Sequence, residues 1–448
     1  MPFDQFQNEK PSVAVIGGGI SGLSTAWALS ESAHVTVLEK DAKFGGHART
    51  VVAGKDGGVS VDTGFIVFNF ANYPHLTRLF RDLDVPIEKS NMSFGVSAEA
   101  GRIEYALSSL DTLFAQRRNA GNPAFLRMIA DVVRFNQRAE AVAVSDDITV
   151  NDLIERLRLG PWFRDYYLLP MCGAIWSTPS VSVGDFPART LVRFFKNHAL
   201  MSVNGQHQWW TVTGGSWQYV SRLQNALIQR GVVMRPKADV RSVQRINGRV
   251  VLNVEGAGPQ TFDHVVFASH ADQTLRMLAD PSKAEETALS KVRFQDNHAY
   301  LHADPSQMPV RQKCWSSWVY QSANTDRAEP QSVGVTYWMN KLQNIDPANP
   351  LFVTLNPSTP ISEDLIYDQN TFRHPVFDHG ALSAQKEIGN LQGERNTWFA
   401  GAWLRHGFHE DGIASGYRVA RALQRSAVSR SRVDAQSLQP QPILQEVG

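Results

Sequence analysis

The apolar pattern is clearest near the N-terminus, where a strand-like run turns through glycines straight into a helical segment. Residues 13–16 are Val-Ala-Val-Ile, and a glycine-rich turn follows them at 17–22. A second apolar run, 34–38, ends in the acid Glu39. Short apolar runs bounded by turn residues are typical of buried strands. The order strand, glycine turn, helix, strand predicts a βαβ unit at the start of the chain.

Farther along the chain, helical and strand-like periodicities alternate in blocks. Helical spacing marks 73–83, 122–141, 220–230 and about 412–423. Strand-like runs occur at 232–235, 240–244, 250–254 and 265–268, and again at 300–302, 315–320, 333–339 and 351–355. The predicted fold class is α/β, of a mixed α+β kind, in which a Rossmann-like domain is interleaved with a second domain containing a mixed sheet and helices.

The changes of pattern also predict the domain boundaries. We assign 1–90, 214–295 and 385–427 to a discontinuous nucleotide-binding domain, and 91–213 and 296–384 to a substrate domain. The polar segment 428–448, which contains two prolines, is expected to be a disordered tail. A chain of 448 residues exceeds what one hydrophobic core usually supports, which agrees with two domains.

Composition excludes several classes of partner and site. With 44 basic and 43 acidic residues, the chain has no overall field to attract nucleic acid or an anionic membrane, although this balance is compatible with a local basic patch. Its two cysteines, Cys172 and Cys314, lack the spacing of a disulfide framework or a zinc site, so no metal is expected. The N-terminus lacks a signal-peptide profile and no apolar run approaches ~18 residues, so we expect a cytoplasmic protein.

The turn after the first strand carries candidate chemistry. Gly17, Gly19 and Gly22 fit G-x-G-x-x-G, in which the glycines allow a tight turn, a close approach to a diphosphate and close helix packing. Ile20 and Ser21 open the helix, whose free N–H groups favour an anion. Glu39, followed by Lys40, is placed to bind ribose hydroxyls, which disfavours a 2′-phosphate. The alternative is a glycine turn in another βαβ unit, with Glu39 an ordinary surface acid.

Three later segments carry a resemblance to a known family. They are Gly45-Gly46-His47-Ala48-Arg49-Thr50, the loop Asp62-x-Gly64, and Phe399-Ala400-Gly401 followed by Gly407 to Gly416. Together with the first turn, they resemble the FAD-dependent amine oxidase, protoporphyrinogen oxidase and phytoene desaturase superfamily. The chain is most similar to a bacterial branch of predicted NAD/FAD-binding oxidoreductases.

The resemblance implies FAD as cofactor and names residues that would contact it. Beyond Gly17, Gly19, Ile20, Ser21, Gly22, Glu39 and Lys40, these are Gly45, Gly46, His47, Gly64, Phe65, Ile66, Val240, Gly401, Asp411, Gly412 and Ile413. A helix starting near Gly412 would direct N–H groups at the flavin pyrimidine and favour its reduced, anionic form. The alternative is that Gly412 and Gly416 only allow close helix packing.

Departures from the family pattern concern the diphosphate and the substrate. His47 stands where the family usually has arginine, with Arg49 as a candidate substitute, and Phe408 stands where many amine oxidases have tyrosine. The C-terminal segment lacks the cysteine that a cysteinyl-flavin link of the monoamine oxidase kind requires, and noncovalent binding is expected.

Aromatic and histidine residues supply the candidates for a substrate pocket and for proton transfer. We select Trp176, Tyr337, Trp403 and Phe408 for the pocket, and His270, His406 and His409 as acid/base candidates, because a neutral imidazole takes a proton near pH 7. For each of these residues the alternative is an ordinary role in the core.

Two oxidation reactions fit these residues, and one hypothesis of another class remains. The first is hydride transfer from a C–H bond of a hydrophobic, lipid-like substrate, an acyl or isoprenoid chain, to FAD. The second is amine oxidation to imine and hydrogen peroxide. The third is a non-catalytic FAD-binding module. The electron acceptor, oxygen or quinone, is left open. The run 190–198 mixes basic and apolar residues, a pattern compatible with peripheral membrane contact or with an ordinary amphipathic helix.

Overall fold

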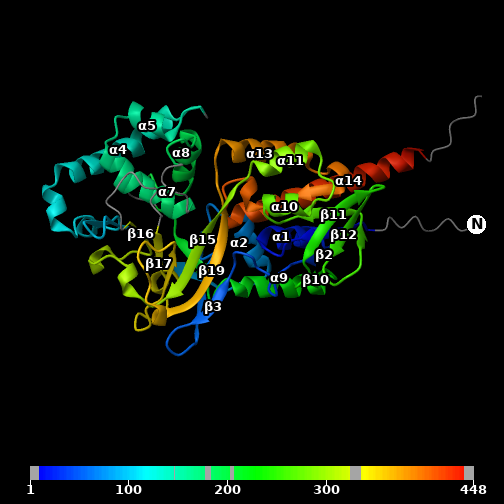
Figure 1. The fold of residues 1–448 in the computed structure, drawn as a ribbon, viewed down its shortest axis with the longest axis horizontal. Helices are drawn as coiled ribbons and strands as arrows, with labels where there is room; N and C mark the ends of the chain where they lie inside the picture. The colour runs from blue at the N-terminus through cyan, green and yellow to red at the C-terminus, as the bar shows by residue number, and fades with distance from the viewer. Residues whose placement is uncertain (1–9, 146, 177–182, 202–205, 323–333, 438–448) are drawn as a thin grey trace, which may run out of the picture.

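The computed structural model describes residues 10–145, 147–176, 183–201, 206–322 and 334–437. It is elongated, with a nucleotide-binding half near the N-terminus and a second half at the opposite end (Figure 1). No helix in the described stretches combines the length and the apolar character needed to cross a membrane.

A five-stranded parallel sheet forms the centre of the first half. Its order is β10 (Val233–Arg235), β2 (His34–Leu38), β1 (Ser12–Ile16), β14 (His264–Phe267) and β20 (Thr397–Phe399). Every neighbouring pair is parallel. The strands come from three distant stretches of sequence, and this confirms the predicted Rossmann-like fold.

Both faces of the parallel sheet are covered, which explains its continuous apolar runs. Val13 and Val15 of β1 pack with α1 (Ile20–Leu29), α2 (Pro74–Asp82), α9 (Trp217–Gln229) and α14 (His409–Ser437). Ala14 and Ile16 face the other layer. That layer consists of α10 (Ala271–Met277), α11 (Lys283–Ser290), α13 (His379–Leu391) and the antiparallel strands β11 (Val240–Ile246), β12 (Arg249–Val254) and β13 (Gln260–Phe262).

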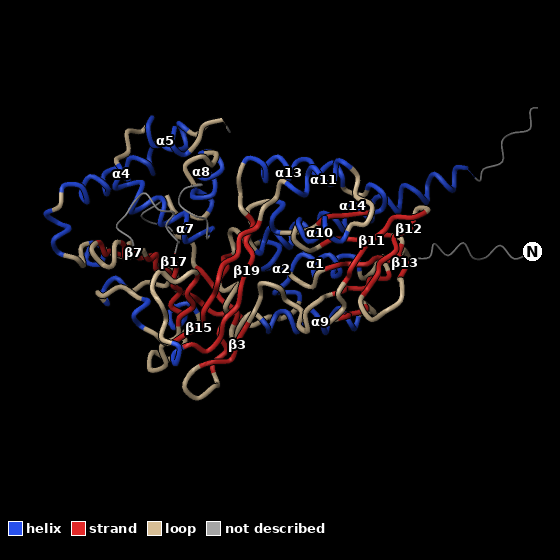
Figure 2. Tube along the Cα trace, viewed as in Figure 1, coloured by secondary structure: helices blue, strands red, loops and turns tan. Residues whose placement is uncertain are grey.

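A seven-stranded mixed sheet forms the second half, as predicted. Its order is β19 (Ile366–Pro375), β15 (Phe294–His302), β18 (Phe352–Leu355), β17 (Gly334–Trp338), β16 (Trp318–Gln321), β7 (Phe94–Ala98) and β8 (Ile103–Ala106). Only the β16–β7 pair is parallel among these strands. The long pair β15–β19 runs through the middle of the molecule, beside the nucleotide-binding half (Figure 2).

Helices cover the far end of this sheet and complete a separate hydrophobic core. They are α3 (Leu110–Leu113), α4 (Pro123–Val142), α5 (Val150–Arg156), α6 (Pro161–Phe163), α7 (Leu169–Trp176) and α8 (Ala188–Asn197), while α12 (Met339–Leu342) follows β17. Both cysteines are free and buried.

Two features differ from the expected boundaries. Strand β9 (Trp209–Val212), which we placed in the substrate domain, pairs with β5 (Val67–Asn69) and β6 (Ile87–Ser90) of the first segment. A smaller pair joins β3 (Thr50–Ala53) to β4 (Val59–Asp62). Helix α14 continues to Ser437, into the segment expected to be a disordered tail, because its alanine, arginine and glutamine residues favour helix. Residues 438–448 lie outside the described ranges.

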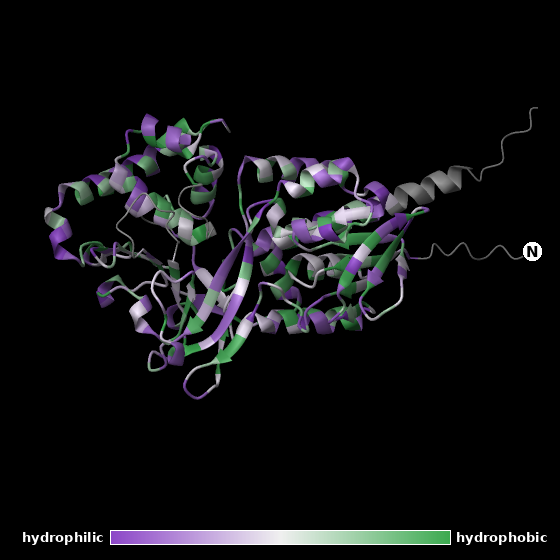
Figure 3. Cartoon of the chain, viewed as in Figure 1, coloured by the Kyte–Doolittle hydropathy of each residue, from purple (hydrophilic) through white to green (hydrophobic). Residues whose placement is uncertain are grey.

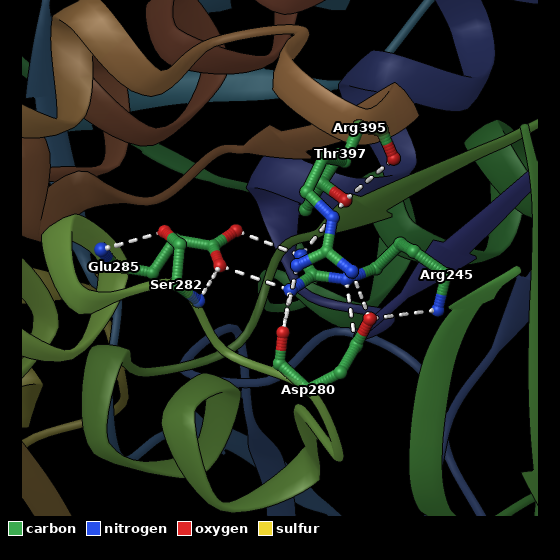
Figure 4. Close-up of polar contacts among 6 residues, drawn as sticks. All are labelled: Arg245, Asp280, Ser282, Glu285, Arg395 and Thr397. Atoms are coloured by element: carbon green, nitrogen blue, oxygen red, sulfur yellow. Dashed lines mark hydrogen bonds and ion pairs between the residues drawn. The ribbon is translucent and has the colours of Figure 1, made fainter.

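A buried ion-pair network holds the second layer against the parallel sheet (Figure 4). Arg245 on β11 donates to Asp280 at 2.8 Å and to both oxygens of Glu285 on α11, at 2.7 and 2.9 Å. It also donates to Thr397 at the start of β20, and Arg395 pairs with Asp280. Burial raises the pKa of Glu285, but hydrogen bonds from Arg245 and Ser282 outweigh it and hold that pKa below its usual value. The network connects β11, α11 and β20.

Candidate active site

One continuous cavity of about 2290 Å³ extends from the glycine turn after β1 into the space under the seven-stranded sheet. Gly17, Gly19 and Glu39 line one end, and Tyr337 and Phe408 line the other. Typical small-ligand pockets have about 300–1,000 Å³. This cavity therefore has room for a dinucleotide together with a second molecule.

The glycine turn places the N-terminus of α1 at the cavity, where no side chain of the described residues caps it. Gly17 has φ +109°, and a Cβ on Gly22 would lie 1.9 Å from the Gly17 carbonyl oxygen, so both positions require glycine. A Cβ on Gly19 would meet only Gly46, at 4.0 Å. Gly19 is also the N-cap of α1 and provides no side-chain hydrogen bond. The first N–H groups of α1, at Ile20 and Ser21, are thus placed to bind an anion in the cavity.

Glu39 is held at the end of β2 by two backbone donors. Its carboxylate accepts from the Gly18 amide at 2.6 Å and the Asp41 amide at 2.9 Å. Burial raises the pKa of Glu39, although both hydrogen bonds oppose that shift. The Ala238 amide donates to the Glu39 carbonyl at 2.8 Å, which brings Val240 to the same end of the cavity. Lys40 lines the cavity here as well.

The second and third glycine motifs pack directly against the first. The Gly45 amide donates to the Gly18 carbonyl at 2.8 Å, and a Cβ on Gly46 would lie 3.2 Å from the Gly19 Cα. A Cβ on Gly64 would lie 2.1 Å from the His47 carbonyl oxygen, which accepts from the Phe65 amide at 2.8 Å. Phe65 and the neighbouring Ile66 line the cavity.

His47 belongs to a cluster of imidazoles on the cavity wall. Its ring centroid lies 5.6 Å from that of His374 on β19 and 6.1 Å from that of His270. Burial lowers the pKa of His47, and burial lowers those of His270 and His374 to about 3. These rings are therefore neutral at pH 7. The Arg49 guanidinium, the candidate substitute for His47, is instead bound by Asp368 at 2.7 and 3.0 Å.

In the C-terminal segment, the helix begins three residues earlier than expected. Helix α14 begins at His409 rather than near Gly412, and Gly401 lines the cavity. A Cβ on Gly412 would lie 2.8 Å from the Ile20 side chain, and one on Gly416 would lie 2.6 Å from the Ser21 carbonyl oxygen. These glycines allow α14 to pack closely on α1. Four predicted cofactor residues do not line the cavity: Gly22, Asp411, Gly412 and Ile413.

The substrate end of the cavity is apolar. Its lining includes Phe94, Tyr167, Met171, Ile175, Phe194, Leu200, Trp318, Tyr337, Leu355 and Phe408. The Phe408 ring stacks on Phe194 with a centroid distance of 5.2 Å. Trp403 also borders the cavity, but its indole is 3% exposed and donates to the Ser269 carbonyl at 3.1 Å. The side chain of Trp176, at the end of α7, lies outside the described residues.

The three histidines selected from sequence line the cavity in different settings. His409 stacks on Phe65 with a centroid distance of 3.9 Å, and its Nε2 lies 2.6 Å from the Tyr219 hydroxyl. His270 stacks on Phe294, and its buried Nδ1 lacks a hydrogen-bond partner within the described chain. Burial lowers the pKa of His406 to about 4.

His198 is a fourth cavity histidine, and its tautomer can be deduced. Its Nδ1 lies 3.0 Å from the Phe194 carbonyl oxygen. A carbonyl oxygen can only accept, so Nδ1 carries the proton. In the neutral ring Nε2 is then a bare acceptor, and the described residues provide it with no hydrogen-bond partner. Burial lowers the pKa of His198, so the neutral form is present at pH 7.

Comparison with known proteins agrees with this geometry. The family model of the NAD(P)-binding Rossmann-like domain matches residues 15–83. No curated protein matches the chain in sequence. A CLA-producing fatty acid isomerase from P. acnes has a similar structure, with 15% identity, a TM-score of 0.67, and coverage of 94% of this chain and 99% of that chain.

Two further solved structures are similar over the same extent. They are a putative protoporphyrinogen oxidase from Exiguobacterium sp. 255-15 and the cyclohexylamine oxidase from Brevibacterium oxydans IH-35A. Both have 15% identity and a TM-score of 0.65, and in each case 93% of this chain and 99% of that chain are covered. The chain shares their fold. The predicted resemblance is thus confirmed at the level of the fold.

Several cavity residues lacked a signal in the sequence. His374, Phe372 and Arg373 come from β19 and line the cavity beside the glycine motifs. We predicted no strand at 366–375, and this segment contains no motif. The pairing of β19 with β15 places these residues beside the cavity. His198 lies in the run 190–198, which we interpreted as a membrane contact or an amphipathic helix and not as a source of a cavity residue.

Proposed function

We propose that this protein is an FAD-dependent oxidoreductase that removes a hydride from a C–H bond of a hydrophobic, lipid-like substrate such as a fatty-acyl or isoprenoid chain. When bound, the flavin would accept the hydride at its N5. The sharing of a fold with known oxidases and a fatty acid isomerase supports the class of protein, and the cavity supports the substrate class.

The residues present fit the cofactor. The open cradle at Gly19 and the uncapped start of α1 suit a diphosphate, and the fixed carboxylate of Glu39 suits ribose hydroxyls. We infer that His47 faces the same cofactor from the second motif, as a neutral imidazole in place of arginine. Asp411, Gly412 and Ile413 would act indirectly, by placing α14 against α1.

The apolar lining of the substrate end is the observation that carries the substrate assignment. Within the described ranges, the acidic residues lining the cavity are Glu39, Asp41, Asp239 and Asp368. The first three lie at the end of β2 and the start of β11, and Asp368 is paired with Arg49. A protonated amine entering the apolar end would therefore lose hydration without meeting a carboxylate, whereas an acyl chain loses nothing.

We assign His198 as the group that accepts the proton accompanying hydride loss. Removing a hydride from one carbon and a proton from its neighbour leaves a carbon–carbon double bond and places the proton on Nε2 of His198. The fixed Nδ1–H leaves that nitrogen unprotonated on a ring that lines the cavity together with Phe408 and Tyr337. His406, His409 and His270 remain the alternatives, and Trp403 and Trp176 would act only as pocket walls.

Amine oxidation is the second candidate, because stacked aromatic rings such as Phe408 and Phe194 can hold a cation over their faces. It predicts hydrogen peroxide formation with amines. A non-catalytic FAD module is the third.

Purification tests the proposal directly. We expect yellow protein that releases FAD on heating and carries co-purified lipid identifiable by mass spectrometry. Colourless protein would contradict the cofactor assignment. A flavoprotein without lipid that forms peroxide from amines would contradict the substrate assignment.

A further inference from the structure

We propose that the outer face of α4, together with the end of α5, is a docking surface for an anionic lipid bilayer. These helices lie at the end of the molecule opposite the N-terminus (Figure 1). The inference rests on the proposed function in one respect: a lipid substrate gives the protein a reason to approach a membrane.

A hollow of about 620 Å³ between α4 and α5 is lined almost entirely by arginine. Its lining residues are Arg127, Arg134, Arg138, Arg156, Leu157 and Arg158. One carboxylate, Asp131, lies 2.8 Å from Arg134 and 3.8 Å from Arg127. Arg138, Arg156 and Arg158 have no ion-pair partner in the described part of the chain. Asp152, one turn before Arg156 on α5, is a second nearby carboxylate. Five cations against two anions leave a local charge of +3 in a protein whose formal net charge is +1.

The buried carboxylate of Asp131 holds part of the hollow in place. Asp131 is 1% exposed in its side chain and also accepts from the Gly160 amide at 2.8 Å. The Arg134 guanidinium donates to the Arg158 carbonyl at 3.3 Å. Arg158 itself has φ +51°, a left-handed backbone conformation that is unfavourable for residues other than glycine. Guanidinium groups bind phosphate oxygens through paired, planar donors, which suits lipid phosphates better than lysine would.

An exposed apolar stripe runs beside the arginines on α4. Leu126, Ala130 and Val133 are spaced by four and three residues, and the leucine and valine are 45% and 46% exposed. Figure 3 shows hydrophobic and hydrophilic residues interspersed along this helix. Apolar side chains flanked by arginine are typical of helices that lie in a membrane interface.

The cavity reaches the surface in the same half of the molecule. Leu107 lines the cavity and is 41% exposed, and Leu110, at the start of α3, is 76% exposed. An acidic protein partner would use the arginines but would give no role to the exposed leucines.

The surface replaces the membrane contact that the run 190–198 suggested. On α8 the apolar residues Leu191, Phe194 and Phe195 are buried and are not exposed to a bilayer surface. Acidic residues on the outer helices do not cancel the arginines. Glu140 pairs with Lys196, Glu155 does not line the hollow, and Asp152 acts on Arg156 alone among the five arginines.

Vesicle sedimentation tests the proposal with the full-length, FAD-loaded protein. We expect binding to vesicles of equal parts phosphatidylglycerol and phosphatidylcholine, weak binding to phosphatidylcholine alone, and loss of binding as salt is raised. The triple variant R127Q/R138Q/R156Q should bind roughly 100-fold more weakly, about fivefold for each arginine. The variant L126S/V133S should also bind more weakly.

A charge-matched control uses exposed arginines of α2 and α14. The triple variant R81Q/R418Q/R421Q removes the same charge and should bind like wild type. Equal loss in both triple variants, or unchanged binding in the first, would overturn the proposal. Thermal stabilisation by inorganic phosphate without vesicle binding would also overturn it, by identifying a site for soluble anions. Because sedimentation does not require catalysis, its result is independent of the substrate assignment.

Discussion

Glu39 is the side chain on which recognition of the cofactor's ribose depends. Its carboxylate is positioned by the Gly18 and Asp41 amides, and a neutral amide cannot accept equally at both atoms. We expect Glu39→Gln to weaken FAD binding by about 10- to 100-fold, since hydrogen bonds to charged groups contribute about 1.5–3 kcal/mol. Fluorescence titration of the apoprotein measures this. Asp41→Asn leaves the backbone donor intact and should bind as wild type. Tight binding by the Gln variant would exclude this role for Glu39.

His198 is the residue whose replacement should affect chemistry without affecting cofactor binding. We expect His198→Gln to slow flavin reduction by about 10²- to 10⁴-fold, the usual contribution of a positioned base, at unchanged FAD affinity. Burial lowers the pKa of His198 below its ordinary 6.5, so the wild-type rate should fall only on the acid side of that value, where the ring protonates. The variant should lose this acid limb.

His406→Gln is the matched control for that experiment, because His406 lines the same end of the cavity without a fixed tautomer. Stopped-flow traces across a pH series compare the two variants. If the rate of flavin reduction still falls at acid pH in His198→Gln, or if this fall disappears in His406→Gln instead, the role of proton acceptor would pass to His406.

At the scale of residues, sequence predicted backbone positions better than side-chain chemistry. Gly17 and Gly64 are fixed by close approaches of the chain, and Gly19 is left open toward the cavity. His198 and His374 could not be selected, since each reaches the cavity through tertiary packing of an element that carries no motif.

Helices α1 and α14 depend on glycine for their contact, and this makes a substitution at Gly416 costly. A Cβ there would lie 2.6 Å from a backbone oxygen, so we expect Gly416→Ala to destabilise the protein by about 1–3 kcal/mol, the usual cost of overpacking. Gly389 on α13 has no atom near its Cβ position. Gly389→Ala should stabilise by about 0.5–1 kcal/mol through helix propensity. Denaturant unfolding of both variants checks the contrast, and equal effects would contradict it.

Glu410 joins the start of α14 to the start of α2 and makes stability depend on pH. Its carboxylate accepts from the His75 and Leu76 amides, yet burial raises its pKa from 4.5 to about 7. A raised pKa stabilises the fold at acid pH, and this contribution is lost as pH rises through the folded value. We expect wild type to lose about 1–2 kcal/mol relative to Glu410→Gln between pH 5 and pH 8. Thermal melts of both proteins measure the difference, and parallel pH curves would contradict it.

At the scale of elements, the predicted helices and strands agree closely with the structure, but their ends do not. The periodicity at 412–423 locates α14, whereas its start at His409 follows from a turn in which the Phe408 amide donates to Asp411 at 3.1 Å. That shift matters, because Gly412 then packs on α1 instead of opening the helix.

The whole molecule combines three stretches of sequence in one sheet and encloses a cavity against a second sheet. Glycine motifs predicted the cofactor end because they constrain backbone locally. At the apolar end, Tyr337 and Phe408 were selected from sequence and line the cavity. The other walls could not be predicted, because they come from β7, β16, α7 and α8, which only the complete fold brings together. Trp209 on β9 illustrates this, since its strand pairs with residues more than a hundred positions away.

The central claim is that a lipid-like C–H bond, and not an amine, reduces the bound flavin. Anaerobic stopped-flow absorbance of the purified flavoprotein, mixed separately with dispersed acyl lipids and with a panel of amines, tests it most directly. We expect bleaching of the flavin band with an unsaturated or methyl-branched acyl lipid and none with the amines. Rapid bleaching by amines, with silence toward every lipid, would contradict the account.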